Sequence, residues 1–512
     1  MSKRLLLFVA LIPWSVRADV TLAPLFTDHA VLQQGKSVPV WGRAAPDETV
    51  TVTFRDQTLH ATAGKDGRWI VHLGVLKPGA PTELVVSGKN LLRLQDIVVG
   101  EVWVCSGQSN MEFTVWGPKG SVYRVENADE EVAAAHFPLI RHFKVERAVA
   151  DRPADTARGA WVVCSPETVG QFTAVGYFFA RDLQQKLGVP IGLINCTWGG
   201  TPIESWMSEA ALRSDLAFAA VDDRWAKAMT DWPAKVAAHV AALATQEKDE
   251  AAAKAAGPTN YAAFLKVKPW LPPPPSPTSP EAPRSLFNGM INPLLPGAIR
   301  GILWYQGESN VSRSCEYHAL LTTMITAWRA HWGQGNVPFY LVQLPKYRGD
   351  DPADTSWARL REAQAQALSL PNTGMAVTID IGDPDNLHPR NKQEVGRRLA
   401  LLACHHLYDI QGDWSGPIFR FATREGAAMR IQFDHADAGL VAHDRPLTGF
   451  QVAGADRQFH SAIVRIERDT IVVFAPEVNA PVAVRYAWAN APEANLFSGA
   501  GLPAAPFRSD GW

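Results

Sequence analysis

The sequence has few cysteines, almost no excess charge and, after its first residues, no apolar run long enough for a membrane helix. The five cysteines are Cys105, Cys164, Cys196, Cys315 and Cys404. No two of them have the close spacing of a zinc site or a redox motif. The formal net charge of −2 gives no reason to expect nucleic acid or an anionic membrane as a partner. These absences leave a globular protein, and nothing in the pattern requires a metal or an organic cofactor.

The first 18 residues resemble a secretory signal. Lys3 and Arg4 form a basic start, residues 5–14 form an apolar segment, and residues 16–18 have the small-x-small pattern of a cleavage site. We therefore expect a mature chain that begins near Asp19 and is exported to a periplasm or outside the cell. Export permits disulfides, but several cysteines lie in apolar runs that also suit buried thiols, so their pairing is left open.

Short β runs with alternating apolar residues occupy both ends of the mature chain. In the N-terminal part, residues 19–98, they are 37–41, 49–54, 69–73 and 83–86. In the C-terminal part, residues 412–512, they are 429–433, 462–466, 471–474 and 482–488. Turns rich in Gly, Pro and Asp separate the N-terminal runs, as in a small sandwich. We expect β-sandwich-like modules there, and the first one either braces its neighbour or binds sugar.

Between these modules, residues 99–411 alternate between β and helical patterns. The apolar β runs are 102–105, 191–196, 299–305, 339–344 and 376–381, and the helical stretches are 175–187, 317–332, 358–370 and 393–407. This alternation predicts an α/β fold, with a five-stranded parallel sheet that carries helices on both faces. An insertion at 222–284 contains an Ala- and charge-rich helical arm, bent at Pro233. It ends in a proline-rich tether with eight prolines between 269 and 283.

The residues with the clearest chemistry follow the first of these β runs. The segment 107–111 reads Gly-Gln-Ser-Asn-Met, which places Ser109 at the mouth of a parallel sheet; Met111 replaces the second glycine of the α/β-hydrolase elbow. Far downstream, Asp385 and His388 stand three residues apart just before a helix. A serine hydroxyl needs a base, and the base needs an orienting partner. We therefore expect Ser109, His388 and Asp385 to act together, with Asp380 and Asp383 as competing candidates for the acid.

Two more polar segments follow the next two β runs, at 198–201 (Trp-Gly-Gly-Thr) and 304–310 (Trp-Tyr-Gln-Gly-Glu-Ser-Asn). Ligands of open parallel sheets bind at the carboxyl ends of the strands, so these segments are expected to meet Ser109. An oxyanion needs fixed donors, and the backbone amide of Ser109 is one. A glycine at 199 or 200 would let a second backbone N–H approach the substrate.

Together these blocks resemble the sialate O-acetylesterases of the SGNH (GDSL-like) hydrolase superfamily, and the chain is also similar to bacterial carbohydrate acetylesterases acting on hemicellulose. The resemblance rests on segments 31–34, 107–111, 199–206, 286–290, 304–309 and 385–388. It implies that Ser109 is the nucleophile, His388 the base and Asp385 its orienting partner. It also makes Gly200 the oxyanion glycine, and it places Asn288 of the fourth block with the substrate-site residues.

The chain departs from the superfamily at 307–310, where Gly-Glu-Ser-Asn replaces the usual Gly-x-Asn-Asp. Ser309 therefore stands where the usual Asn donor would be, and Gln306 is the preferred substitute donor. Glu308 has three alternatives: it orders Gln306, contacts His388 or forms a supporting salt bridge.

The resemblance implies a carboxylic ester hydrolase that removes O-acetyl groups from sialic acid through an acyl-serine intermediate. An acetylesterase of xylan or xyloglucan oligosaccharides is the alternative with the same chemistry. An inactive, secreted carbohydrate-binding protein is the alternative from another class, and the presence of Ser109, Asp385 and His388 argues against it. The oligomeric state and the identity of the sugar are not encoded in these motifs.

Overall fold

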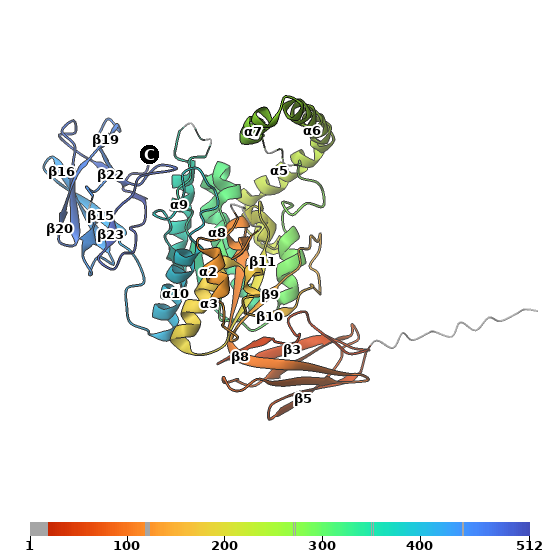
Figure 1. Cartoon of the computed structure of the whole chain (residues 1–512). Helices are drawn as coiled ribbons and strands as arrows, with labels where there is room; N and C mark the ends of the chain where they lie inside the picture. The colour runs from red at the N-terminus through yellow and green to blue at the C-terminus, as the bar shows by residue number, and fades with distance from the viewer. Residues whose placement is uncertain are drawn as a thin grey trace, which may run out of the picture.

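A computed structural model describes residues 19–117, 123–269, 271, 273–349, 351, 353–442 and 445–512. The expected export signal at 1–18 lies outside the described residues. Figure 1 shows a central α/β layer with a β module at each end of the chain and a helical arm that stands apart from them. No helix within the described residues is long and apolar enough to cross a bilayer. All five cysteines are free thiols, four of them buried and Cys315 exposed.

The N-terminal module is built mostly from antiparallel strands; its short strand Val31–Gln33 is buried and pairs in parallel with the strand that follows the module. Its strands are β1 (Thr21–Leu22), β2 (Val31–Gln33), β3 (Val38–Arg43), β4 (Thr49–Phe54), β5 (Gln57–Thr62), β6 (Arg68–Leu73) and β7 (Thr82–Ser87). Strand β8 (Leu91–Gly107) then runs without a break from this module into the central sheet. Its first half pairs with β7 and its second half with β11 and β12. One hydrophobic core accordingly spans the module and the α/β layer.

The central sheet is larger than the five strands expected. Besides β8 it contains β9 (Ile140–Lys144), β10 (Trp161–Val163), β11 (Ile191–Thr197), β12 (Gly301–Tyr305), β13 (Phe339–Val342) and β14 (Thr373–Ala376). Their order is β10-β9-β11-β8-β12-β13-β14. All neighbours are parallel except the edge strand β10, which is antiparallel to β9. The fifth expected strand, at 376–381, is shifted: the strand is 373–376, and the chain leaves the sheet after Ala376.

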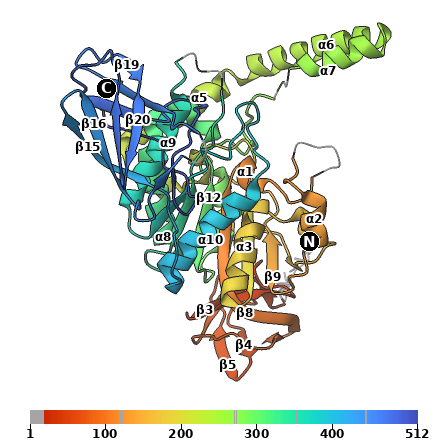
Figure 2. The same cartoon turned by 60° about the vertical axis from the view of Figure 1, so that its left-hand side comes forward.

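Four long helices cover the sheet, close to their expected positions: α3 (Ala174–Leu187), α8 (Ser314–Trp332), α9 (Ser356–Gln366) and α10 (Lys392–Tyr408). α3 and α10 pack against each other, as do α8 and α9 (Figure 2). Trp103 on β8 contacts Phe179 of α3, while Trp304 on β12 contacts Trp328 of α8. Trp304 is level with Ser106 of β8. Successive side chains of a strand point to opposite faces, so Ser106 and Trp304 point away from the face that carries Trp103 and Cys105. The two helix pairs therefore cover opposite faces of the sheet.

The inserted arm consists of α5 (Ala219–Thr230), α6 (Trp232–Ala255) and α7 (Pro258–Val267), and no residue of α6 or α7 is buried. Figure 2 shows α6 and α7 projecting from the body. The helix is interrupted at Asp231, and Pro233 lies in the first turn of α6, where a proline needs no N–H partner. The described part of the proline-rich tether has no regular helix or strand.

The C-terminal module has a hydrophobic core of its own. Its strands are β15 (Ile418–Glu425), β16 (Ala428–Asp434), β17 (Leu440–Val441), β18 (Phe450–Ala453), β19 (Phe459–Ser461), β20 (Ile463–Glu467), β21 (Thr470–Phe474), β22 (Ala483–Tyr486), β23 (Phe497–Ser498) and β24 (Phe507–Arg508). They form two four-stranded antiparallel sheets, β15-β16-β21-β20 and β19-β18-β22-β24, and the short pair β17-β23. The expected β module is therefore present.

The sheet brings its three polar strand ends to one place. β8 lies between β11 and β12, and in the register Gly107 is level with both Thr197 and Tyr305. The segments that begin at Gln108, Trp198 and Gln306 therefore leave the sheet side by side. The chain continues from β8 to one side of the sheet and later returns to the other, which is the switch point where open α/β sheets bind ligands.

Candidate active site

A sharp turn at the end of β8 presents Ser109. Gly107 has φ +133°, and a Cβ at this residue would lie 2.2 Å from the carbonyl oxygen of Tyr305, so only glycine fits between the strands. Gln108 is extended, and the short helix α1 (Ser109–Glu112) begins immediately after it. Ser109 thus stands at the top of the central strand, as expected from the motif.

The nucleophile candidate meets His388 directly. The Oγ atom of Ser109 lies 2.8 Å from Nε2 of His388, which is on the loop between β14 and α10. With the proton on Nδ1, Nε2 accepts the hydroxyl hydrogen. Burial, reinforced by the positive charge of Lys392, lowers the pKa of His388 to about 4. The imidazole is therefore neutral near pH 7, which is the form that can accept a proton from serine.

Asp385 does not contact the imidazole in this structure. Its side chain is 70% exposed and its Oδ1 lies 2.9 Å from Nη1 of Arg348. Among the described residues no hydrogen bond joins it to His388, whose backbone N–H donates instead to Asn386 Oδ1 at 2.9 Å. The orienting role of Asp385 stays a prediction that requires a side-chain rotation.

The two competing carboxylates are held elsewhere. Asp380 accepts two hydrogen bonds from Arg398, at 2.7 and 2.6 Å. Asp383 accepts the backbone N–H of Asp385 at 2.9 Å. Their contacts shape the loop that carries His388 and do not extend to its ring.

A buried polar network below Ser109 was not foreseen from the sequence. Asn110 donates through Nδ2 to Glu308 Oε1 at 2.6 Å and to the carbonyl oxygen of Leu387 at 3.0 Å. Its Oδ1 accepts from Lys392 Nζ at 2.6 Å. Asn110 therefore ties the nucleophile helix to the residue that precedes His388.

The charged members of this network are deeply buried. Burial lowers the pKa of Lys392 to about 7, and burial raises the pKa of Glu308. The bond between Glu308 and Asn110 is none of the three roles considered for this carboxylate. In the sequence, Lys392 resembles an ordinary charged residue at the start of a helix. Only Asn110, next to the serine, could have indicated this network.

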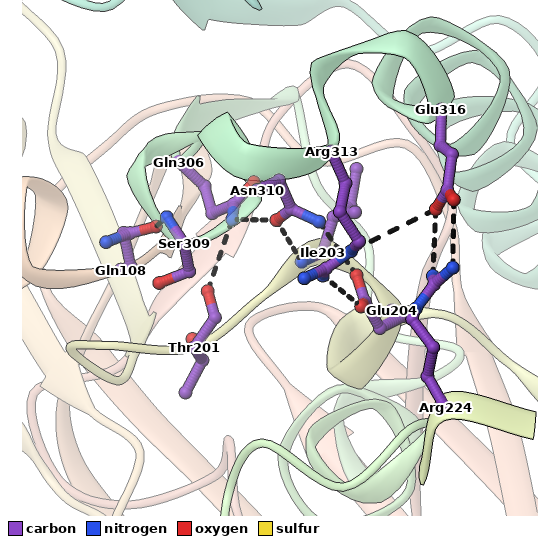
Figure 3. A network of polar contacts seen from close by, with 10 residues as sticks. All are labelled: Gln108, Thr201, Ile203, Glu204, Arg224, Gln306, Ser309, Asn310, Arg313 and Glu316. Carbon is purple, nitrogen blue, oxygen red and sulfur yellow. Dashed lines mark hydrogen bonds and ion pairs between the residues drawn. The ribbon is translucent and has the colours of Figure 1, made fainter. Parts of the chain in front are cut away.

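The side-chain amide of Gln306 forms its hydrogen bonds within the protein (Figure 3). Its Nε2 donates to the carbonyl oxygen of Thr201 at 3.2 Å and to Asn310 Oδ1 at 2.8 Å, while its Oε1 accepts from Tyr317. An amide has two N–H hydrogens, and both are used here. This arrangement argues against Gln306 as an oxyanion donor. Its contacts fix the third polar segment against the second.

Asn310 links these two segments further. Its Oδ1 also accepts the backbone N–H of Ile203 at 2.9 Å, and its Nδ2 donates to Glu204 at 2.9 Å. Glu204 is in turn paired with Arg313. In the third segment Ser309 donates its backbone N–H to Gln108 Oε1 at 3.2 Å.

Gly200 has φ +77°, and a Cβ placed on it would have no atom within 4 Å, so this glycine borders open space. The loop that carries it is held by Glu112, whose Oε2 accepts the backbone N–H of Gly199 at 2.9 Å. A Cβ on Gly199 would lie 3.2 Å from Cβ of Ser109, so this loop passes directly over the serine. The position suits the expected oxyanion role of Gly200.

Asn288 is separate from the Ser109–His388 pair. It is buried in the π-helical turn η4 (Phe287–Ile291), and its Nδ2 donates to the carbonyl oxygen of Ala150 at 3.3 Å. Its carbonyl oxygen accepts the backbone N–H of Ala154 at 2.9 Å. Among the described residues, the partners of Asn288 are backbone groups, and these contacts anchor the 150–154 segment.

A pocket of about 590 Å³ begins beside α1. Glu112, one turn after Ser109, forms part of its wall, together with His142, Lys144 and Arg147. Glu112 holds both cations: its Oε1 accepts from Arg147 at 2.6 Å and lies 3.5 Å from Lys144 Nζ. Arg147 also lies over the ring of Trp198. Within the described residues, no cluster of His, Cys, Asp and Glu has the makeup of a metal site.

Comparisons with known proteins agree with the family resemblance seen in the motifs. A family model described as "Carbohydrate esterase, sialic acid-specific acetylesterase" matches residues 99–256 and 281–404. A sialate O-acetylesterase of Rattus norvegicus is 30% identical over 438 residues, which cover 78% of this chain and 76% of the relative. The one of Homo sapiens is 29% identical over 440 residues, covering 78% and 73%.

A solved structure described as a novel carbohydrate acetylesterase from Xanthomonas citri superposes with a TM-score of 0.80. It is 35% identical in sequence, and the match covers 96% of this chain and 100% of the other. The similarity extends over all three parts of the fold. The family resemblance derived from the motifs is thereby confirmed.

Proposed function

The chain belongs to the carbohydrate esterase family of sialic acid-specific acetylesterases, and from this premise we propose that it removes O-acetyl groups from sialic acids through an acyl-serine intermediate. It is a carboxylic ester hydrolase. The observation that supports the proposed mechanism most strongly is the 2.8 Å contact between Ser109 Oγ and His388 Nε2. Ser109 and a neutral imidazole together form an activated nucleophile.

In the proposed first half-reaction, Ser109 Oγ attacks the acetyl carbonyl carbon while its proton moves to Nε2 of His388. The tetrahedral intermediate carries negative charge on the former carbonyl oxygen, near the backbone N–H groups of Ser109 and Gly200. When the intermediate collapses, the bond to the sugar oxygen breaks and His388 returns the proton to that oxygen. The sugar leaves with a free hydroxyl, and the acetyl group remains on Ser109.

In the second half-reaction, His388 removes a proton from water, whose oxygen attacks the acetyl-serine carbonyl. Collapse of the second intermediate breaks the bond between the acetyl carbon and Ser109 Oγ, and His388 returns its proton to that oxygen. The acetic acid released ionises to acetate in water. The imidazole is positively charged in both transition states. We propose that Asp385 turns from Arg348 toward His388 to stabilise that charge.

We propose that the pocket beside α1 receives the carboxylate end of an acidic sugar whose acetyl group lies at Ser109. Lys144 and Arg147 line it together with the carboxylates of Glu112 and Glu167, and Glu112 pairs with both cations. A sialic acid carries a carboxylate, and guanidinium groups bind carboxylates with matching planar geometry. The pocket volume of about 590 Å³ is that of a small-molecule site. We further propose that the chain is exported by means of residues 1–18.

The test is acetate release from a panel of O-acetylated sialic acids, acetylated xylan and xyloglucan oligosaccharides, and 4-nitrophenyl acetate. We expect kcat/KM for the sialic acids to exceed that for the oligosaccharides by at least tenfold. A preference for xylan or xyloglucan would keep the chemistry and replace the substrate. If the wild type released no more acetate than Ser109→Ala from any of these esters, the esterase function would be wrong and carbohydrate binding would be the remaining alternative.

A further inference from the structure

The side chain of Gln108 contacts the third polar segment. Gln108 immediately precedes Ser109, and its residue is only 2% exposed. It is the N-cap residue of α1, yet its side chain makes no capping hydrogen bond. Its amide therefore has another role than to cap the helix.

Backbone N–H groups of the third polar segment hold the amide oxygen of Gln108. Oε1 accepts the backbone N–H of Ser309 at 3.2 Å and faces that of Gly307 at 3.5 Å. Figure 3 shows this oxygen turned toward Ser309 and the amide nitrogen on the opposite side. The third segment thus fixes the orientation of the Gln108 amide.

The amide nitrogen of Gln108 has no acceptor among the described residues. It also keeps some contact with solvent, because it is not one of the fully sealed side-chain atoms that lack a partner. Gln306 differs in this respect, because both of its N–H hydrogens are bound by Thr201 and Asn310. Of the two glutamines at these strand ends, Gln108 alone has N–H groups available for a ligand.

We propose that the Nε2–H of Gln108 is a donor of the oxyanion hole and acts beside the backbone N–H groups of Ser109 and Gly200. This inference rests on the proposed esterase function. The third segment contributes by orienting Gln108 through the backbone N–H groups of Ser309 and Gly307. A donor fixed before the reaction stabilises the developing charge without reorganisation.

The deciding variant is Gln108→Glu. A carboxylate keeps an oxygen for the Ser309 N–H and so preserves the contact that orients the segment, but it has no hydrogen to donate. We expect kcat for 4-nitrophenyl acetate and acetylated sialic acid to fall by roughly 10²- to 10³-fold or more, with KM changed by less than about threefold. Gln108→Ala should lose kcat by a similar factor.

The matched control is Gln33→Ala at the opposite end of the sheet. Gln33 is also a buried amide whose Oε1 accepts a backbone N–H, that of Val102 at 2.8 Å. Its loss should lower the melting temperature and leave kcat of the folded enzyme unchanged. Melting curves for all variants separate loss of fold from loss of catalysis.

A second readout is the rate at which an organophosphonate inactivates the enzyme, because its phosphoryl oxygen develops the same charge. The rate should fall in Gln108→Glu in parallel with kcat. If Gln108→Glu folds and retains more than a third of wild-type kcat, Gln108 only orients the segment and the inference is wrong. If the wild type releases no acetate, the proposed function and this inference fail together.

Discussion

Ser109 Oγ lies 2.8 Å from Nε2 of His388, although 279 residues separate them in sequence. The contact exists because β8 ends at the centre of the sheet, while the loop after β14 crosses back over that end. Asn110 fastens this crossing by bonding to the carbonyl oxygen of Leu387. The geometry of the pair therefore depends on residues that touch neither substrate nor imidazole.

The acidity of His388 sets the pH dependence. Because its pKa is lowered to about 4, the imidazole stays neutral down to that pH. We expect kcat/KM to rise with pH through about 4 and to be level between about 5 and 7. A pH–rate profile with 4-nitrophenyl acetate measures this. A rise centred near 6.5, the ordinary value for histidine, would show that the environment of the ring is different.

Lys392 contributes to this shift through its charge. Lys392→Met removes a positive charge near the imidazole, which should raise the pKa of His388 and move the acid limb of the profile to higher pH. Lys392→Arg keeps the charge and serves as the control. Identical acid limbs in the wild type and Lys392→Met would mean that burial alone lowers the pKa.

Asn110→Ala should weaken both fold and catalysis. It removes the bond to the Leu387 carbonyl and leaves Glu308 and Lys392 without the amide that joins them. We expect unfolding free energy, from urea titration, to fall by about 1–3 kcal/mol. In the folded variant, kcat should fall more than tenfold, since His388 loses its anchor. Asn292→Ala, which removes an amide bonded to Ala154 away from Ser109, should leave kcat unchanged.

Asp385→Asn tests the proposed rotation toward His388. If the carboxylate stabilises the imidazolium during reaction, the variant should lower kcat at least tenfold with little effect on KM. Arg348→Gln frees Asp385 from its ion pair, so it should leave kcat unchanged or raise it. If kcat were equal in Asp385→Asn and the wild type, Asp385 would have no role beyond its surface ion pair with Arg348.

Substrate choice is expected to depend on Arg147. Arg147→Gln should raise KM for an acetylated sialic acid by about tenfold and leave KM for 4-nitrophenyl acetate within twofold, because only the sugar carries a carboxylate. Steady-state kinetics with both esters measures the difference. If KM changed equally for both esters, Arg147 would instead act by holding Glu112, which supports the Gly199–Gly200 loop.

The sequence predicted the elements with strong periodicity and missed those whose residues carry mixed signals. Helices α3, α8 and α10 have clear apolar stripes and begin within three residues of the expected positions. Strand β9 was not predicted because its buried residues include Arg141 and His142. The run 376–381 resembles a strand, but only Ala376 belongs to β14; Asp380 bonds Arg398 and helps to shape the loop that carries His388.

The sequence predicted that Ser109 and His388 lie together. It did not predict the contacts of the residues that support them. The meeting of three strand ends follows from the topology of parallel sheets. Which amide faces the substrate does not follow, since Gln108 and Gln306 have the same chemistry and differ only in the acceptors that the fold places beside them. Likewise, nothing in the sequence around Lys392 indicates that the helix start is buried against Asn110.

The most direct test of the account is to find which residue becomes covalently modified. The protein is treated with an organophosphonate, digested and analysed by peptide mass spectrometry, with Ser109→Ala in parallel. We predict a single adduct on Ser109, loss of esterase activity in step with its formation, and a Ser109→Ala kcat lowered by roughly 10⁴-fold or more with an unchanged melting curve. An adduct on another residue, or a Ser109→Ala variant that keeps a tenth of wild-type activity, would contradict the account.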